Sequence, residues 1–196
     1  MKQSIKMLIN NRIIYSLLKN KIFDMNNNQL KETTKLMLRP PLPEDGARVH
    51  QLVGECPPLD TNSMYCNLLQ CTHFARTSVA AMQENDPNNN LLGFISAYLI
   101  PDRNNTLFIW QVAVSEQARG LGLAGNMLKQ ILDRPQCTQV SYLETTITES
   151  NQASWALFNS LAKKLGTRLE KSAMFDRDKH FAGKHDSEFL ARLGPF

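Results

Sequence analysis

The stretch Leu107-Phe108-Ile109-Trp110-Gln111-Val112-Ala113-Val114, followed two residues later by Gln117-Ala118-Arg119-Gly120-Leu121-Gly122-Leu123-Ala124, decides the fold of this chain. The first segment is nearly all apolar, as expected for a central strand covered on both faces. The second segment holds two glycines, which allow a tight turn. Beyond the turn, apolar residues recur at helical spacing, and residues 140–147 again have the character of a strand; the helical positions are Ala124, Met127, Leu128 and Ile131. Together the segments predict a β-turn-α-β unit.

The glycine turn has the properties of an anion-binding site. Glycine lets the backbone approach a ligand closely, and the unpaired N–H groups and the dipole at the start of the next helix favour a negative group such as a pyrophosphate. Glycines are also common in ordinary strand-to-helix turns, so a Gly-x-Gly pattern alone gives the two interpretations equal weight. The surrounding residues decide between them.

The turn and the strand before it resemble the acetyl-CoA loop of the GNAT acetyltransferases, Gln/Arg-x-x-Gly-x-Gly/Ala, with Gln117, Gly120 and Gly122 on its fixed positions. The resemblance implies that the strand backbone pairs with the pantetheine arm of acetyl-CoA and that N–H groups of the turn hold its pyrophosphate. The residues so implied are Val112, Ala113 and Val114 on the strand, and Arg119, Gly120, Leu121, Gly122, Leu123 and Ala124 on the turn.

Two further positions bear on this resemblance. Asn151 opens a predicted helix and matches a family position that often contacts CoA, although an Asn before a helix also serves as a cap. Many relatives carry Tyr where Phe158 stands, and Phe cannot donate a proton to the leaving thiolate. Tyr142, Tyr65 and ordered water remain as alternative donors.

The rest of the chain supplies further strands and helices in an order that excludes a Rossmann fold. The expected elements are a strand at 36–39, helices at 44–56, within 59–72 and at 151–165, strands at 77–82 and 91–100 joined by a polar turn, and strands near 168–174 and 188–193. The order β-α-α-β-β-β-α-β-α-β-β predicts a single α/β domain over residues 37–196. The GNAT resemblance implies a mixed, mostly antiparallel sheet flanked by helices.

A narrower resemblance, to the diaminobutyrate acetyltransferases, covers nearly everything from Leu38 to Phe196. Its stretches are Pro57-Pro58-Leu59-Asp60-Thr61-Asn62-Ser63-Met64-Tyr65, Gln70-Cys71-Thr72-His73-Phe74, the strand at 107–114, Glu144-Thr145-Thr146-Ile147-Thr148 and His180-Phe181-Ala182-Gly183-Lys184-His185-Asp186-Ser187-Glu188. It implies a cytoplasmic, homodimeric N-acetyltransferase of ectoine (compatible solute) synthesis. The enzyme would move acetyl from acetyl-CoA to the 4-amino group of L-2,4-diaminobutyrate. The alternatives are a GNAT enzyme acting on another small amine or a peptide N-terminus, and a non-catalytic acyl-CoA-binding module.

A diamino acid carries one carboxylate and two amines, so its pocket needs acidic groups for the ammonium and donors for the carboxylate. Asp60 and Glu144 are the candidate catalytic bases or ammonium partners. Asp60, Trp110, His185 and Glu188 are the candidate substrate-binding residues. The structural alternatives are that Asp60 caps a helix, Trp110 belongs to the core and His185 is a surface residue.

Composition excludes several other classes. The net charge is +4, but residues 1–36 carry +5 and the remainder −1, so no basic surface for nucleic acid is expected in the domain. The four cysteines have neither zinc spacing nor a disulfide framework, which predicts reduced thiols. The tail residues Asp176, Asp178, His180, His185 and Glu188 match no familiar metal-ligand spacing, so no metal is predicted.

Residues 1–36 form a basic leader, rich in Asn and Lys, which we expect to be disordered and outside the domain. Its apolar stretch is broken by Asn10-Asn11-Arg12, leaving neither a signal-peptide core nor a span of about 20 apolar residues, so no membrane association is predicted. Two interpretations stay open: a transit peptide for an organelle, or translated leader preceding a true start at Met25 or Met37.

We predict that the leader is dispensable, because it offers few apolar residues to dock it and the family resemblance begins only near Leu36. A protein that starts at Met37 should keep wild-type turnover in a steady-state assay. Loss of soluble, active protein on this truncation would show that the leader is part of the fold.

Overall fold

The computed structural model describes residues 35–196. Residues Met37–Phe196 form one compact unit, and the boundary with the preceding residues falls at Leu36. Nearly all of the predicted leader lies outside the described residues, so its disorder stays a prediction. The compact unit is the α/β domain.

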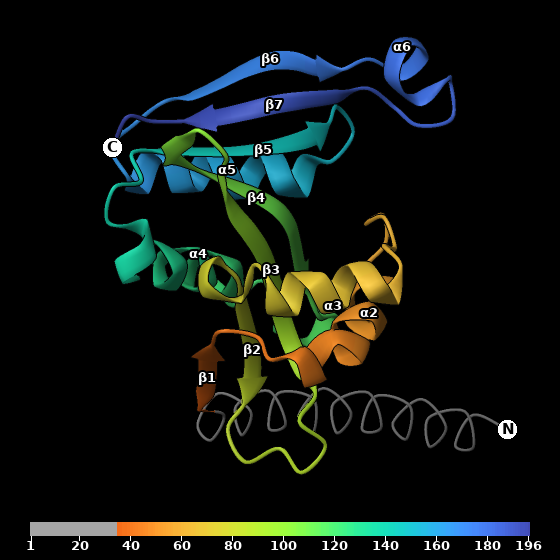
Figure 1. Cartoon of the computed structure of the whole chain (residues 1–196), viewed down its shortest axis with the longest axis vertical. Helices are drawn as coiled ribbons and strands as arrows, with labels where there is room; N and C mark the ends of the chain where they lie inside the picture. Colours follow the sequence, from red (N-terminus) through yellow and green to blue (C-terminus); the bar gives the residue numbers. More distant parts are fainter. Residues whose placement is uncertain (1–34) are drawn as a thin grey trace, which may run out of the picture. The chain divides into compact units, whose positions relative to one another are not determined.

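One sheet runs through the described part of the chain, with strand order β1-β2-β3-β4-β5-β7-β6 (Figure 1). The strands are β1 (Leu36–Arg39), β2 (Val79–Gln83), β3 (Leu91–Ile100), β4 (Arg103–Val114), β5 (Tyr142–Thr148), β6 (Leu169–Phe175) and β7 (Glu188–Leu193). The helices are α2 (Gly46–Gly54), α3 (Met64–Thr72), α4 (Leu123–Leu132), α5 (Gln152–Lys164) and α6 (Arg177–Phe181). Strand β4 pairs with β5 in parallel, whereas the pairings β2–β3, β3–β4, β5–β7 and β6–β7 are antiparallel, so the prediction of a mixed, mostly antiparallel sheet with helices is confirmed.

The predicted element order is correct apart from local differences. The short helix α6 was missed, because five residues give no readable apolar period. Strand β4 begins at Arg103 rather than Leu107, since its polar first residues are held by pairing with β3. In α4 the buried position is Leu123 rather than Ala124, which is half-buried beside a cavity.

The parallel pairing of β4 with β5 is short. It joins Thr106, Leu107 and Phe108 to Tyr142, Leu143 and Glu144, and then stops. Beyond that point β4 continues beside β3 to Val114, whereas β5 continues beside β7 to Thr148. The two central strands therefore diverge, and their facing edges are left free to bind other groups.

A β-bulge lies where the strands part. Ser96 of β3 is opposite Gln111, but Ala97 is opposite Ile109, so Trp110 is an extra residue on β4. A bulge bends its strand and increases the local twist. It therefore accounts for β4 turning away from β5 directly after Phe108.

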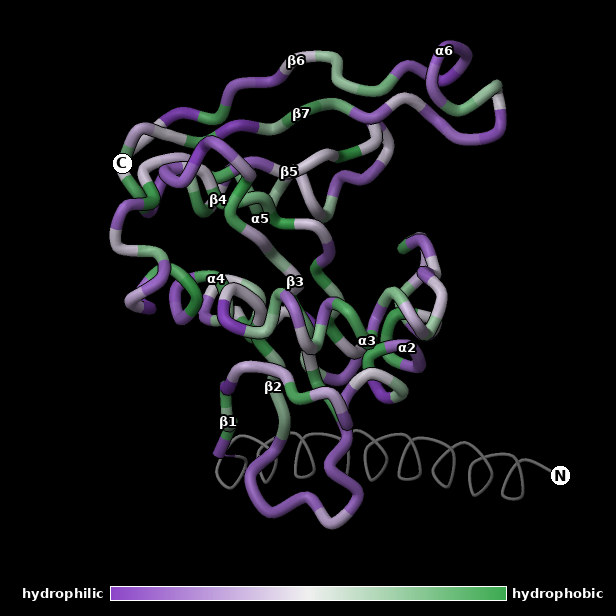
Figure 2. The backbone as a smooth tube through the Cα atoms, viewed as in Figure 1, coloured by the Kyte–Doolittle hydropathy of each residue, from purple (hydrophilic) through white to green (hydrophobic). Residues whose placement is uncertain are grey.

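Two apolar clusters hold the layers together. The larger lies where the sheet meets α4 and α5 and includes Leu107, Ile109, Met127 and Phe158; the smaller lies under α2 and includes Phe94. Figure 2 shows the contrast between strand β3, with its apolar residues, and the hydrophilic loop that joins β2 to β3. That loop is the polar turn expected from the sequence.

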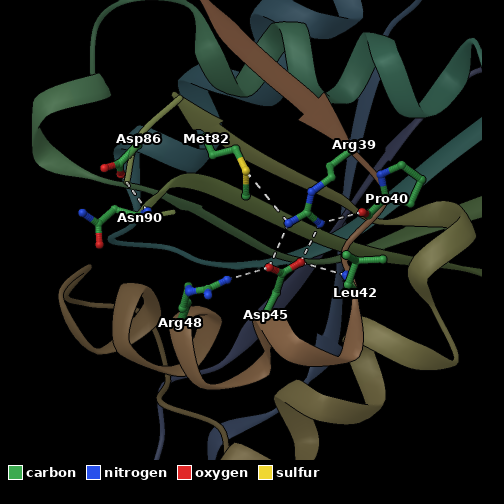
Figure 3. A network of polar contacts seen from close by, with 8 residues as sticks. All are labelled: Arg39, Pro40, Leu42, Asp45, Arg48, Met82, Asp86 and Asn90. Atoms are coloured by element: carbon green, nitrogen blue, oxygen red, sulfur yellow. Dashed lines mark hydrogen bonds and ion pairs between the residues drawn. The ribbon is translucent and has the colours of Figure 1, made fainter. Parts of the chain in front are cut away.

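A buried ion pair fixes the start of the domain (Figure 3). Asp45, only 1% exposed, accepts hydrogen bonds from Arg39 Nη1 (2.6 Å) and Nη2 (2.9 Å) and from the Leu42 N–H (2.8 Å), with Arg48 Nη1 at 3.3 Å. Burial alone would raise the pKa of Asp45, but the hydrogen bonds from Arg39 and Leu42 and the two nearby cations outweigh it and hold the pKa below its usual value. The pair joins the end of β1 to the beginning of α2.

We predict that Asp45→Asn lowers the free energy of unfolding by about 1.5–3 kcal/mol at pH 7, the value of a charge-assisted hydrogen bond. A group with a lowered folded-state pKa stabilises the fold above its unfolded pKa of about 3.9, and that stability is lost as the pH falls through the lower folded pKa. Denaturant titrations should therefore show the difference from wild type shrinking below about pH 4. Asp133→Asn, at an exposed pair with Lys129, is the control. An Asp45→Asn protein as stable as wild type at pH 7 would contradict the prediction.

Candidate active site

A cavity of about 520 Å³ opens where β4 and β5 separate. Residues 109–112 of β4 and 145–148 of β5 form its inner walls. Pro58, Leu59, Asp60 and Asn62 from the loop between α2 and α3 lie on one side, and residues 183–186 with Glu188 lie on another. The divergence of two strands thus brings loops from opposite ends of the chain to one cleft, which we call the acceptor cavity.

A second cavity, of about 450 Å³, lies against the glycine turn, and we call it the donor cavity. It shares Pro58, Leu59, Val112, Asn151 and Ser154 with the acceptor cavity, so the two adjoin. Of the residues predicted for acetyl-CoA, those that line it are Val112, Val114, Arg119, Gly120, Gly122, Leu123, Ala124 and Asn151. Ala113 is instead buried in the smaller core cluster, and Leu121 is exposed outside the cavity lining.

The glycine turn has the geometry that anion binding requires. Gly120 and Gly122 have φ of 75° and 74°, a left-handed conformation that a side chain would strain. A Cβ built on either glycine meets no atom within 4 Å, so the space beside them is open. The first bond within α4 runs from the Asn126 N–H to the Gly122 carbonyl (3.1 Å), which leaves the preceding N–H groups of this helix start for a ligand.

Asn151 caps a helix, as one of its two interpretations expected, while its contact with CoA stays a prediction. Its Oδ1 accepts a hydrogen bond from the Ser154 N–H (3.1 Å) at the start of α5, which is a helix cap. The same residue lines both cavities. The helix that it caps therefore begins at the junction of the cavities.

Asp60 and His185 meet in the acceptor cavity. The Asp60 side chain is 81% exposed, and its Oδ2 lies 3.4 Å from His185 Nε2. The pKa of His185 is raised, first by the hydrogen bond from its Nδ1 to the Asp186 carbonyl (2.8 Å) and then by the charges of Asp60 and Glu188. Ser63, not Asp60, caps α3, by accepting from the Cys66 N–H. The interpretation of Asp60 as the helix cap is therefore wrong.

Glu188, the first residue of β7, is a half-buried carboxylate in the same cavity. Burial raises its pKa, against the opposing effects of a hydrogen bond from Thr146 and the charge of His185. Its Oε2 is buried and has no hydrogen-bond partner among residues 35–196. An unsatisfied carboxylate oxygen with a raised pKa is suited to accept a proton.

Glu144 does not reach either cavity, contrary to its prediction as a site residue. It is buried at 2% exposure, and Arg103 holds it by two parallel hydrogen bonds of 2.9 Å, with Arg192 Nε at 3.5 Å. Two guanidinium groups neutralise this carboxylate and occupy its oxygens. It is the last residue of β5 that pairs with β4, which makes it a structural link near the point where the strands part.

Trp110 lines the acceptor cavity and is 42% exposed, so it is not a core residue. Its ring packs against Phe74 (centroids 6.1 Å apart) and Tyr98 (6.5 Å) on the face of the sheet away from α4 and α5. The bulge places this side chain at the divergence of the strands. An aromatic wall in this position suits the aliphatic chain of a small substrate.

The structure brings to the site several residues that the sequence analysis did not assign to it. Arg177 and Lys184 line the acceptor cavity and supply positive charge. Ser154 places a hydroxyl group one helical turn before the buried Phe158 and lines both cavities. The alternative proton donors Tyr65 and Tyr142 line neither. In the sequence, Arg177, Lys184 and Ser154 resemble ordinary surface or helix residues, and only the folded chain brings them together at the cavities.

In the described part of the chain, no group of three or more His, Cys, Asp or Glu side chains is arranged to hold a metal ion. Asp176 and His180 have structural roles instead: Asp176 caps α6, and His180 Nδ1 accepts from the Asp176 N–H (2.7 Å). None of the helices within residues 35–196 has the length and apolarity needed to cross a membrane.

Comparison with known proteins agrees with this geometry. The model of the acetyltransferase (GNAT) family matches residues 47–162, and the chain belongs to that family. At 17% identity and a TM-score of 0.64, the NatC complex bound to Gag peptide and CoA shares the fold over 83% of this chain and 99% of that chain. The GNAT fold expected from the glycine turn is thereby confirmed.

Relatives at higher identity share one name. L-2,4-diaminobutyric acid acetyltransferase of Methylotuvimicrobium alcaliphilum is 55% identical over 82% of this chain and 91% of that protein, and the protein of that name from Vibrio parahaemolyticus is 50% identical over 81% and 86%. The structure of diaminobutyrate acetyltransferase EctA from Paenibacillus lautus, in complex with its substrate L-2,4-diaminobutyric acid and coenzyme A, matches with a TM-score of 0.77 at 34% identity. It covers 83% of this chain and 96% of that chain. The narrower resemblance is therefore also confirmed.

We predict that Gly122→Val weakens acetyl-CoA binding by at least about tenfold, because a β-branched side chain would occupy the open space beside the turn that the pyrophosphate needs. The variant also carries the strain of a left-handed residue, which costs about 1–2 kcal/mol. Gly166→Val is the matched control, since Gly166 has φ of 68° and open space around its Cβ but lines neither cavity. Calorimetric titration should show weak binding only in the Gly122 variant. Equal affinities in the two folded variants would remove the phosphate-binding assignment.

Proposed function

We propose that the protein transfers the acetyl group of acetyl-CoA to the 4-amino group of L-2,4-diaminobutyrate. The products are N4-acetyl-L-2,4-diaminobutyrate, for ectoine synthesis and hence osmoprotection, and free CoA. The observation that carries this proposal is the pair of adjoining cavities, in a chain that matches a diaminobutyrate- and CoA-bound relative over 83% of its length. The donor cavity would take acetyl-CoA and the acceptor cavity the diamino acid.

The charges of the acceptor cavity complement such a substrate. Asp60 and Glu188 provide carboxylates for its two amino groups, and Arg177 and Lys184 provide cations for its carboxylate. Asp186 lies 3.9 Å from Arg177, whereas no ion-pair partner of Lys184 occurs within residues 35–196. We therefore assign Lys184 to the substrate carboxylate and Trp110 to the aliphatic chain.

The acceptor amine must lose a proton before it attacks, because an alkyl ammonium has a pKa of about 10.4. We assign Glu188 as the general base that takes this proton, directly or through a water molecule. Among the three acidic candidates, Glu144 is neutralised by arginine and Asp60 is largely exposed, whereas Glu188 is half-buried with a free oxygen and a raised pKa. Asp60 then serves as partner of the other ammonium, beside His185.

The neutral amine would attack the thioester carbonyl where the two cavities adjoin, near Val112. The edge of β4 beyond Phe108 is not paired with β5, so a backbone N–H there is available to stabilise the oxyanion of the tetrahedral intermediate. Collapse of that intermediate breaks the C–S bond and releases the CoA thiolate, and the proton that the attacking nitrogen loses on becoming an amide balances the one that the thiolate takes up to give free CoA. Ser154 lies at the junction and can donate a hydrogen bond to the departing sulfur, a role that the Phe158 ring cannot fill.

We further propose that the protein is a cytoplasmic homodimer. Its four cysteines are free thiols, as a reducing compartment favours. Strand β6 is an edge strand that pairs only with β7 and exposes Met174 and Phe175. An exposed edge with apolar side chains is the kind of surface that a second copy would cover.

The direct test is mass spectrometry of the product formed from acetyl-CoA and L-2,4-diaminobutyrate, with the acetylated nitrogen assigned by NMR. We expect a single acetyl group, on the 4-amino nitrogen. A panel of other amines and peptides separates the alternative acceptors, and 1,3-diaminopropane, which lacks the carboxylate, should be the poorer substrate. Absence of free thiol with every acceptor would instead favour a non-catalytic acyl-CoA-binding module.

We predict that Glu188→Gln lowers kcat about 10²- to 10³-fold, as expected for loss of a general base, and that the loss diminishes at higher pH as more of the amine becomes neutral. The wild-type kcat should fall on the acidic side of the profile, because the base acts only when ionised and its pKa is raised. Glu44→Gln, at an exposed position that lines neither cavity, is the control. A folded Glu188→Gln enzyme with a kcat within about twofold of wild type would exclude the assignment.

A further inference from the structure

In the loop between α2 and α3, the part that carries Asp60 is hydrogen-bonded to the sheet through one side chain. Gln111 Nε2 donates to the Asp60 carbonyl (3.1 Å), and Gln111 Oε1 accepts from Asn62 Nδ2 (3.3 Å). In the described part of the chain, both hydrogen bonds that join Asp60 and Asn62 to β4 thus end on Gln111. Elsewhere the loop is held by the hydrogen bond from Cys56 Sγ to the Val114 carbonyl of β4 (3.3 Å), by the packing of Leu59 on the smaller core cluster and by the Ser63 cap of α3.

The amide of Gln111 is fixed in one orientation. It is 7% exposed, and a carbonyl oxygen can only accept hydrogen bonds, so the group that faces Asp60 must be the amide nitrogen. The oxygen is then left for the Asn62 amide, whose nitrogen donates. Both ends of a buried amide are therefore used, and rotating it would lose both bonds.

The attachment matters because the side chain of Asp60 is not held by burial. At 81% exposure, its carboxylate can stay near His185 only if the loop backbone is fixed. Gln111 also directly precedes Val112, which lines both cavities, and directly follows the bulged Trp110. One side chain of β4 thus connects the strand of the donor cavity with the loop of the acceptor cavity.

We propose that Gln111 is a positioning residue, which with Asn62 forms a clasp that holds Asp60 in place for the ammonium group of the acceptor. This inference rests on the proposed function, in which Asp60 binds that ammonium group. The clasp itself takes no part in proton or acetyl transfer. Its effect is to keep a carboxylate of the binding site in position before the substrate arrives, which lowers the entropic cost of binding.

The test is the Gln111→Met variant, which keeps the size of the side chain but removes both hydrogen bonds. We expect the KM for diaminobutyrate to rise about tenfold to a hundredfold, while kcat and the KM for acetyl-CoA stay within about twofold of the wild-type values. The reason is that the interaction with the ammonium group is lost equally from the ground state and the transition state. Gln83→Met, at the exposed end of β2, is the matched control. A folded Gln111→Met enzyme with an unaltered KM for diaminobutyrate overturns the proposal.

A double-mutant cycle shows whether Gln111 acts through Asp60. In an Asp60→Asn background, Gln111→Met should change the KM for diaminobutyrate by less than about twofold, because the carboxylate that it positions is already gone. Equal effects of Gln111→Met with and without Asp60 would show a general structural role and overturn the clasp. Asn62→Ala, which removes one bond from a loop residue, should raise the same KM in the same direction; if Gln111→Met does not fold, a normal KM in Asn62→Ala overturns the proposal.

Hydrogen–deuterium exchange separates this inference from the proposed function. Peptides that cover residues 58–65 should exchange faster in Gln111→Met than in wild type or Gln83→Met, whatever acceptor the enzyme uses. Unchanged exchange would contradict the clasp even if diaminobutyrate is the substrate. A wild-type enzyme that leaves diaminobutyrate unmodified would contradict the proposed function, while faster exchange in the variant would still support the attachment of the loop.

Discussion

The short parallel contact between β4 and β5 is the constraint on which the rest of the structure depends. Three residue pairs hold the halves of the sheet together, and the strands then separate because each continues with a different antiparallel neighbour. A longer contact would close the cleft, and a missing one would divide the sheet. The Arg103–Glu144–Arg192 ion pairs lie at the end of this contact, where they bind residues of β4, β5 and β7 to one another.

Three carboxylate side chains near the divergence of β4 and β5 show how the local environment gives the same chemical group different roles. Glu144 is buried and neutralised by two arginines, so it stabilises the sheet. Glu188 is half-buried with a free oxygen, and burial raises its pKa, so it is suited to accept a proton. Asp60 is exposed, and its carboxylate lies 3.4 Å from the His185 ring. Burial and partners, rather than residue type, separate the structural link from the proposed base and from the proposed ammonium partner.

Much of the fold was predictable, because β4 contains a nearly continuous apolar run, α4 and α5 have clear apolar periodicity, and the glycine turn has a characteristic spacing. The donor cavity followed from the same local pattern. The acceptor cavity was only partly predictable, since it is assembled from loops far apart in the sequence. Nothing near Glu144 reveals that Arg103, 41 residues earlier, would occupy its oxygens, and nothing near Gln111 reveals its contact with a loop 51 residues away. Lys184 likewise looked like one more surface charge.

The bulge at Trp110 makes the length of β4 as important as its composition. Before the bulge, Leu107 and Ile109 enter the larger core cluster; after it, Val112 and Val114 pack there, while Ala113 enters the smaller one. The extra residue thus changes which alternate positions face each layer. Insertion or deletion of one residue in this strand would move every residue beyond it to the opposite layer. It would thereby remove Val112 and Val114 from the lining of the donor cavity. Single substitutions in β4 therefore leave the alternation of its side chains between the two layers unchanged, whereas the number of residues in the strand is fixed.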